Sequence, residues 1–182
     1  MASKHAQDLR RRIDAASENL SRQLQGMDAH MERADAPGEW TTREVLSHLL
    51  FEPGFDPAVT LATFSEHDYP VVEIAPGDTF LDEQRRQLTL SQFRGALDAQ
   101  RRRVLEYIEG LEEPAFERRK ARIPFFKQFM GTDEITIGFS VRLSPTGYCR
   151  KSCATHTAPS AEPASRGPGG RAPASTVARR HG

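Results

Sequence analysis

The sequence is poor in cysteine and has no long apolar run. Its only two cysteines, Cys149 and Cys153, both lie near the C-terminus. A secreted domain held together by disulfides would need more cysteines, spread through the chain. No apolar stretch reaches the roughly 20 residues of a membrane-spanning helix, and the polar N-terminus lacks the apolar centre of a signal peptide. The sequence therefore predicts a cytoplasmic protein with no membrane partner.

The chain also lacks a net charge, with 25 Lys and Arg against 25 Asp and Glu. Residues 1–143 hold 19 basic and 24 acidic side chains, a net charge of −5, whereas residues 144–182 hold 6 and 1, a net charge of +5. Two arginine runs, 10–12 and 101–103, would spread their charges around a helix instead of along one face. We interpret them as solvated faces and predict no nucleic-acid partner.

Large apolar residues disappear after Leu143. Residues 144–182 contain no Leu, Ile, Phe, Met or Trp, although all ten Phe lie earlier. Such a segment cannot bury enough apolar area to offset the entropy lost on ordering it. We therefore predict one domain, residues 1–143, and a disordered basic tail, residues 144–182. One hypothesis is that the chain from about residue 140 derives from a shifted reading frame or is a divergent terminus, which sequencing of the coding DNA would test.

Apolar residues recur at helical spacing in the first 143 residues. The longest such series is Leu9, Ile13, Ala16, Leu20, Leu24, Met27 and Met31. The pattern predicts helices over residues 4–34, 42–51, 57–66 and 90–111, and a short helix ending at Gln87 that Thr79 together with Asp82 would cap. Residues 115–131 are rich in aromatics and too irregular for a regular helix, so we expect them to cover one end of the domain, either as an apolar lid or as a wall of a substrate pocket.

Residues 132–143 carry conflicting signals. Ile135, Ile137, Phe139, Val141 and Leu143 alternate as in a strand, whereas Thr132 and two acidic residues are typical of a helix start. We favour a helix, because three amphipathic helices need a fourth to cover their apolar faces. The predicted fold is therefore all-α.

The segment Trp40–Leu50 combines local structure with candidate chemistry. Thr41 and Glu44 have the spacing of a capping box, and Trp40 precedes the cap as in a hydrophobic staple. His48 lies on the edge of the apolar face of the predicted helix and would point toward a helical interior. It is either a partly buried histidine with one hydrogen-bond partner or a metal ligand in the core of a bundle.

The sequence Trp-Thr-Thr-Arg-Glu-Val-Leu-Ser-His-Leu-Leu resembles the second-helix motif of the DinB-like (YfiT-like) superfamily of bacterial four-helix bundles. The likeness extends more loosely over residues 5–143. It implies an up-down bundle that binds a divalent metal, zinc or nickel, through three histidines, and thiol-dependent transferase, isomerase or hydrolase activity. By this resemblance His48 is the first metal ligand. The other two would be histidines four residues apart on the fourth helix, and none occur before that helix is lost near Leu143.

Substitute ligands come only from the tail. His156 is the nearest candidate, and Cys149, Cys153 and His156 would share one face of a helix. Thiolates and imidazoles both bind zinc, but prolines on both sides of this segment favour a chance arrangement. We therefore expect an incomplete metal site with low occupancy.

Three functions remain open at this stage. The chain is a metal-dependent enzyme acting on a small molecule with a thiol co-substrate, a non-catalytic helical module, or a truncated and inactive family member. The second reading predicts a homodimer, because a shortened fourth helix would leave an apolar strip on residues 9–31 exposed. Nothing in the sequence identifies a substrate or decides whether the chain is an enzyme.

Overall fold

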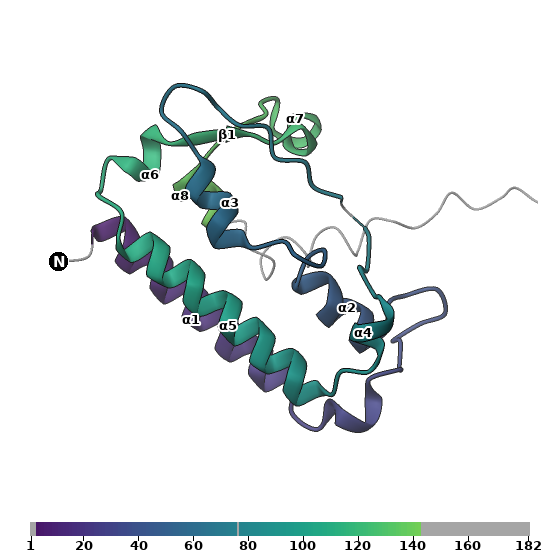
Figure 1. Ribbon diagram of the computed structural model, residues 1–182. Coiled ribbons are helices and arrows are strands. Elements are labelled where there is room, and N and C mark those ends of the chain that lie inside the picture. Colours follow the sequence, from purple (N-terminus) through teal and green to yellow (C-terminus); the bar gives the residue numbers. More distant parts are fainter. Residues whose placement is uncertain (1–2, 76, 143–182) are drawn as a thin grey trace, which may run out of the picture.

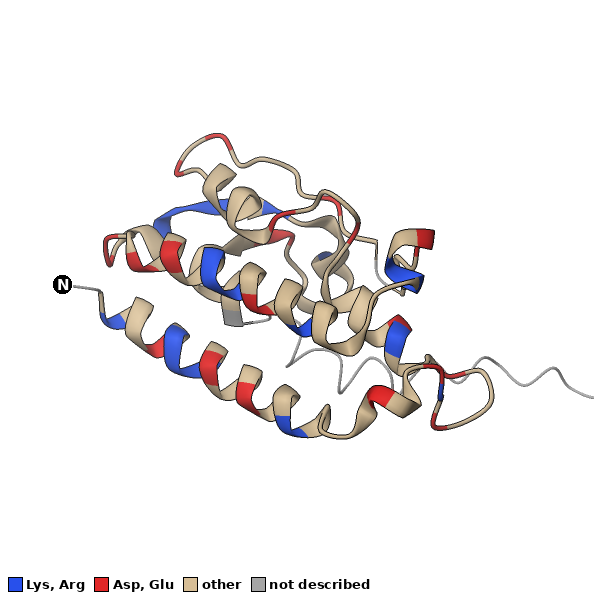
Figure 2. Cartoon of the chain, turned by 60° about the horizontal axis from the view of Figure 1, so that its bottom comes forward, with Lys and Arg blue, Asp and Glu red and all other residues tan. Residues whose placement is uncertain are grey.

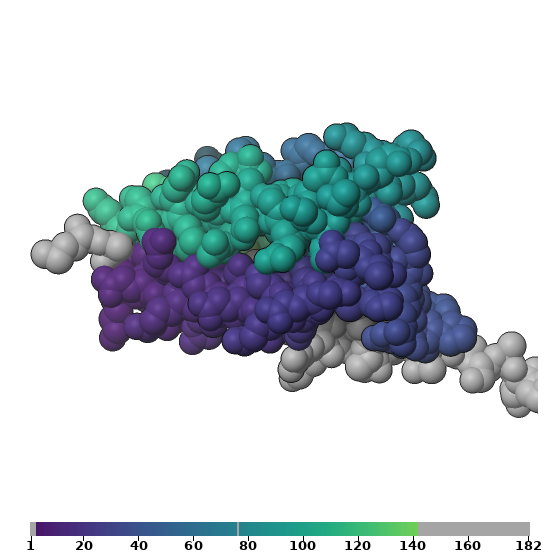
Figure 3. Space-filling view, turned by 90° about the horizontal axis from the view of Figure 1, so that it is seen from below, coloured from purple at the N-terminus to yellow at the C-terminus, as the bar shows by residue number. Residues whose placement is uncertain are grey.

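The computed structural model describes residues 3–142 except residue 76, and that part of the chain is mostly helical (Figure 1). Two long helices, α1 (Lys4–Gln23) and α5 (Leu90–Glu109), run side by side in opposite directions, and their side chains meet along much of their length (Figure 3). The shorter helices are η1 (Met27–His30), α2 (Thr42–Leu49), α3 (Pro57–Thr63), α4 (Glu83–Arg86), α6 (Ala115–Arg118), α7 (Pro124–Met130) and α8 (Ile137–Arg142). The mostly helical character predicted from the sequence is thus confirmed.

A small sheet, which the sequence analysis did not predict, lies beside α6 and α8. Strand β1 (Lys120–Arg122) pairs antiparallel with β2 (Glu134–Thr136), and Ala121 is opposite Ile135. The connection from α3 to α4 passes β1 and forms single bridges to it from Ser65 and Val71 before it returns to α2 (Figure 1). The sheet therefore attaches this long connection to the helices.

Buried apolar side chains form two separate clusters at opposite ends of the α1–α5 pair. The larger cluster contains Ala6, Leu9, Leu61, Phe64, Leu105, Ile108, Phe116, Ala121, Ile123, Phe126, Ile135, Ile137 and Val141. The smaller contains Leu24, Met31, Leu46, Leu90 and Phe93. Between them, Ile13 and Leu20 of α1 and Leu97 and Val104 of α5 are only partly buried. The long helices are therefore most firmly packed at their two ends.

The prediction of one helix over residues 4–34 is wrong. Helix α1 ends at Gln23, Gly26 has a φ of 74°, and the chain continues in the 3-10 helix η1. A left-handed residue interrupts the α-helical hydrogen bonds, and glycine adopts that conformation without a steric cost. Met31 is nevertheless buried beside Leu24. Leu24 and Met31 are thus buried in the same cluster, as the apolar spacing predicted, although the backbone between them is not α-helical.

The prediction that residues 115–131 are irregular is also wrong. This segment contains helix α6, strand β1 and helix α7. Pro124 occupies the first turn of α7, where its missing N–H costs no hydrogen bond, and Gly131, with a φ of 74°, ends the helix. These elements span only 3 to 7 residues each, which is too short for a periodic pattern to be recognised.

Residues 132–143 combine the two alternatives that the sequence left open. The segment begins as strand β2 and continues as helix α8, and Ile135 and Ile137 are both fully buried. Gly138 lies close to α6, because a Cβ atom at this position would be 3.3 Å from the carbonyl oxygen of Phe116. The preferred prediction of a helix throughout is therefore wrong for β2 and correct for α8 as far as Arg142.

Two further expectations concern the C-terminal tail and membrane-spanning helices. The predicted tail, residues 144–182, lies outside the described residues, as do Cys149, Cys153 and His156. No helix in the described part is both long enough and apolar enough to cross a membrane.

Candidate functional site at the end of helix α2

Helix α2 begins where the sequence predicts. The hydroxyl oxygen of Thr41 accepts a hydrogen bond from the Glu44 N–H at 3.2 Å, and the Glu44 carboxylate accepts one from the Thr41 N–H at 2.7 Å. These reciprocal bonds confirm the capping box. They fix the first turn of α2, and with it the position of His48 in the last turn.

The half-buried ring of His48 lies between two aromatic rings. Its centroid is 5.0 Å from the ring of Trp40 and 6.1 Å from that of Phe80, which is nearly parallel to it. The Nδ1 atom is 2.7 Å from the carbonyl oxygen of Asp78. A carbonyl oxygen can only accept, so Nδ1 carries the proton and donates it. In the neutral ring, Nε2 then keeps a free lone pair.

The helical pattern predicted that His48 would point toward a helical interior, but its observed neighbours are not core residues of other helices. They come from Trp40, which precedes the helix, and from residues 78–80 of the connection between α3 and α4. His48 therefore joins α2 to this connection. The arrangement matches one of the two readings left open above, a partly buried histidine with a hydrogen-bond partner, and it leaves a ligating nitrogen available.

Arg85 gathers several carbonyl groups around the end of α2. Its Nη1 atom is 3.0 Å from the carbonyl oxygen of Ser47, 2.5 Å from that of Phe51 and 3.2 Å from that of Phe80. It is also 3.3 Å from the hydroxyl of Ser47, the one buried polar side chain among the described residues. Burial lowers the pKa of the Arg85 guanidinium and the Asp82 carboxylate opposes that shift, but arginine stays charged at neutral pH.

Phe51 and Phe80 have unusual backbone conformations. Their φ angles are 60° and 52°, and they are the two non-glycine residues of the described chain with a positive φ. Bulky residues rarely adopt this region, and such strain is commonly found at functional sites. Phe51 follows the end of α2, so the helix stops at Leu49 instead of continuing to Phe51 as predicted.

A second arginine supports the same region. The Arg43 guanidinium donates to the carbonyl oxygens of Leu88, at 2.6 Å, and of Arg85, at 3.4 Å, and its Nε is 2.5 Å from the Glu32 carboxylate. The sequence analysis identified neither Arg43 nor Arg85 as a site residue. Several of their partners are backbone carbonyls 34 to 45 residues away, and no local motif marks such contacts.

The described residues supply one suitable metal ligand but not a complete set. No three His, Cys, Asp or Glu side chains within residues 3–142, residue 76 aside, are grouped so that they could hold a metal ion. Zinc in proteins is usually held by three or four such ligands. His156, Cys149 and Cys153 cannot be placed relative to His48, because they lie outside the described residues.

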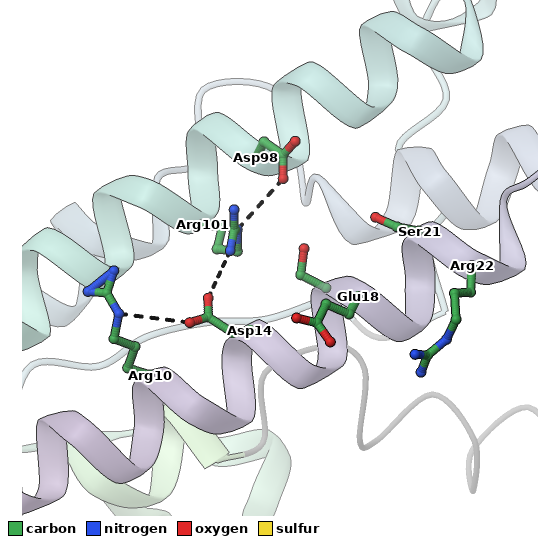
Figure 4. Close-up of a pocket in the computed structure, with 8 residues that line it drawn as sticks. Arg10, Asp14, Glu18, Ser21, Arg22, Asp98 and Arg101 are labelled. Atoms are coloured by element: carbon green, nitrogen blue, oxygen red, sulfur yellow. Dashed lines mark hydrogen bonds and ion pairs between the residues drawn. The ribbon is translucent and has the colours of Figure 1, made fainter.

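An open groove of about 740 Å³ lies between α1 and α5 (Figure 4). It is lined by Arg10, Asp14, Ser17, Glu18, Ser21, Arg22, Asp98 and Arg101. Several of these charges pair with one another. Arg101 donates to Asp14 at 2.8 Å and lies 3.6 Å from Asp98, and Arg10 lies 3.8 Å from Asp14 (Figure 4). The groove therefore has no excess of one charge that would attract an ion.

Acidic and basic residues are also interspersed along both long helices (Figure 2). The arginines of the two runs are exposed, as predicted for solvated faces, except Arg101, which is half-buried and pairs with Asp14 in the groove. Comparisons of the chain with models of protein families, with curated proteins and with solved structures find no match. The site is therefore interpreted from its own geometry.

Proposed function

We propose that the chain is a DinB-like helical protein in which His48 binds a divalent metal ion, zinc or nickel, weakly and as part of an incomplete site. The observation that supports this most directly is the hydrogen bond from Nδ1 of His48 to the carbonyl oxygen of Asp78. Metal-ligating histidines commonly donate their other ring N–H to such an acceptor, which fixes the ring and directs the free nitrogen to the metal.

The arrangement of the helices supports the proposed bundle. Helices α1 and α5 are its two long members, and α2 and α3, interrupted at Pro53-Gly54, together occupy the place of a third and contact α5. Helix α8, which contacts α1, occupies the place of the fourth and is described to Arg142.

The proposed site is a binding site and not a catalytic centre. Metal-assisted hydrolysis or thiol activation needs a metal that is held firmly and keeps one open position. A single histidine does not provide this, so we derive no reaction and no substrate from it. In the cytoplasm, the compartment that the sequence predicts, we expect the chain to bind metal with low occupancy and to have little activity of its own.

The first test is replacement of His48 by alanine. An ion that binds only the folded state stabilises it, by about 2.7 kcal/mol at 100 times its dissociation constant. Added zinc or nickel should therefore raise the melting temperature of the unmodified protein by several degrees and leave that of His48→Ala unchanged. His67→Ala, which removes an exposed histidine from the long connection, is the control and should respond like the unmodified protein. An equal response of both variants, or none in the unmodified protein, would contradict the proposal.

A second candidate function, homodimerisation, is favoured by the partial exposure of the apolar residues of α1. Ile13, Ala16 and Leu20 belong to the apolar series of α1, yet each is only half-buried. Apolar surface left at a helix face favours association, and a second copy could cover it with the same residues.

This candidate predicts a dimer in sedimentation velocity at micromolar concentration. Leu20→Asp should shift the protein to monomer, because it places a charge in the proposed contact. Ala15→Asp, at an exposed position of the same helix, should leave the dimer intact. A monomeric unmodified protein would exclude the homodimer.

A further inference from the structure

We infer that Arg85 is a positioning residue for His48, and that it acts by holding the backbone that determines which ring nitrogen of His48 carries the proton. The inference starts from the unusual number of acceptors around one nitrogen atom. Nη1 of Arg85 lies within 3.3 Å of the carbonyl oxygens of Ser47, Phe51 and Phe80 and of the Ser47 hydroxyl. It bridges the end of α2 and the connection that precedes α4.

Both positive-φ phenylalanines are among these partners. Phe51 and Phe80 expose their carbonyl oxygens to Arg85 in conformations that a non-glycine residue keeps only where its surroundings hold it. Arg85 is half-buried and always charged, and the two hydrogens on its Nη1 atom can be shared among several carbonyl oxygens at once. The backbone of Arg85 is itself held, because its N–H donates to the Asp82 carboxylate at 2.7 Å.

Phe80 transmits this arrangement to His48 in two ways. Its ring lies over the imidazole, with an interplanar angle of 5°. Its N–H donates to the Asp78 side chain at 2.8 Å, which holds the turn whose Asp78 carbonyl accepts from Nδ1 of His48. Without Arg85, Phe80 is free to leave its strained conformation. The Asp78 carbonyl would then turn away, and Nδ1 of His48 would lose its acceptor.

The simpler alternative is that Arg85 only caps the C-terminal carbonyls of α2, as cations commonly do at helix ends. In that case its loss would lower stability and leave the ring of His48 as it was. The effect on the protonated nitrogen is independent of any metal. Only the consequence for metal binding, namely that Arg85→Ala weakens it, rests on the proposed function of His48.

The test is long-range ¹H–¹⁵N NMR of the imidazole side chains, recorded on the full chain at a pH where His48 is neutral. In the unmodified protein we expect Nδ1 to carry the proton. In Arg85→Ala we expect the form with the proton on Nε2 to become the major one, and in Arg85→Lys, which keeps the charge but not the fork of donors, an intermediate mixture. Arg43→Ala is the matched control, because it removes another guanidinium that donates to backbone carbonyls of this region but not to Phe80. It should lower the melting temperature and leave the proton on Nδ1.

Two results would overturn the inference. One is an unchanged Nδ1–H form in a folded Arg85→Ala protein, and the other is an equal change in Arg43→Ala. If Arg85→Ala does not fold, Arg85→Lys decides, and a spectrum identical to that of the unmodified protein would reject the inference. A parallel zinc titration separates this inference from the proposed function. If the proton moves to Nε2 in Arg85→Ala but the unmodified protein binds no zinc, the metal site is rejected and the role of Arg85 is retained.

Discussion

Replacing Phe116 by alanine should lower the free energy of unfolding by about 3–5 kcal/mol, a large part of the roughly 5–15 kcal/mol that stabilises a typical domain. Phe116 has no exposed surface and belongs to the larger apolar cluster, where α6 contacts α8 and β2. Its removal leaves a cavity between elements too short to collapse around it without losing other contacts. Urea denaturation followed by circular dichroism measures the loss.

The control for this prediction is Phe129→Ala. The Phe129 side chain is 58% exposed, so its truncation removes little buried area and should cost far less than that of Phe116. Hydrogen exchange adds a spatial test, since Phe116→Ala should weaken protection most in α6, α8 and the first half of α1. Equal losses of stability in the two variants would show that the larger cluster is not the main core.

Replacing Phe93 by alanine should have a comparable effect, about 3–5 kcal/mol, at the other end of the molecule. Phe93 is fully buried in the smaller cluster, together with Leu46 of α2 and Leu24, which follows α1. The packing that holds α2 against α5 depends on this ring. Hydrogen exchange should therefore increase first in α2 and η1, and urea denaturation should give the total loss.

Arg94→Ala is the control for Phe93→Ala, because Arg94 is the next residue of α5 and is exposed. Its replacement should change stability by less than about 0.5 kcal/mol. The two phenylalanine variants also test the separation of the clusters. If Phe93→Ala weakens protection in α6 and α8 as much as in α2, the clusters unfold as one cooperative unit and their division has no energetic meaning.

The parts of this structure that could be predicted from the sequence depend on neighbouring residues. The capping box of Thr41 and Glu44 involves residues three apart, and the helix start predicted at residue 57 agrees with α3, which Asp56 caps. Long amphipathic helices are recognised by repetition, so the helix predicted over residues 90–111 agrees with α5 at its start and differs by two residues at its end. His48 was identified as a candidate ligand because it lies in one of these well-marked helices.

The parts that were missed depend on contacts between distant residues. The apolar spacing continues from Leu24 to Met31, and only the conformation of Gly26 shows that α1 does not extend to Met31. Strand β2 exists because β1 lies beside it, and the two are separated by α7. His48 and Arg85 both contact the connection after α3, through Asp78 and Phe80, so these surroundings of the site could not be read from the helix that carries it.

The contact between Trp40 and His48 makes this corner of the molecule observable by fluorescence. Trp40 is the single tryptophan of the chain, and its ring lies 5.0 Å from the imidazole. Its emission therefore reports the state of one local site, because the chain has no other tryptophan. A change in the charge or occupancy of His48 should alter the intensity of that emission, and no other tryptophan contributes to the signal.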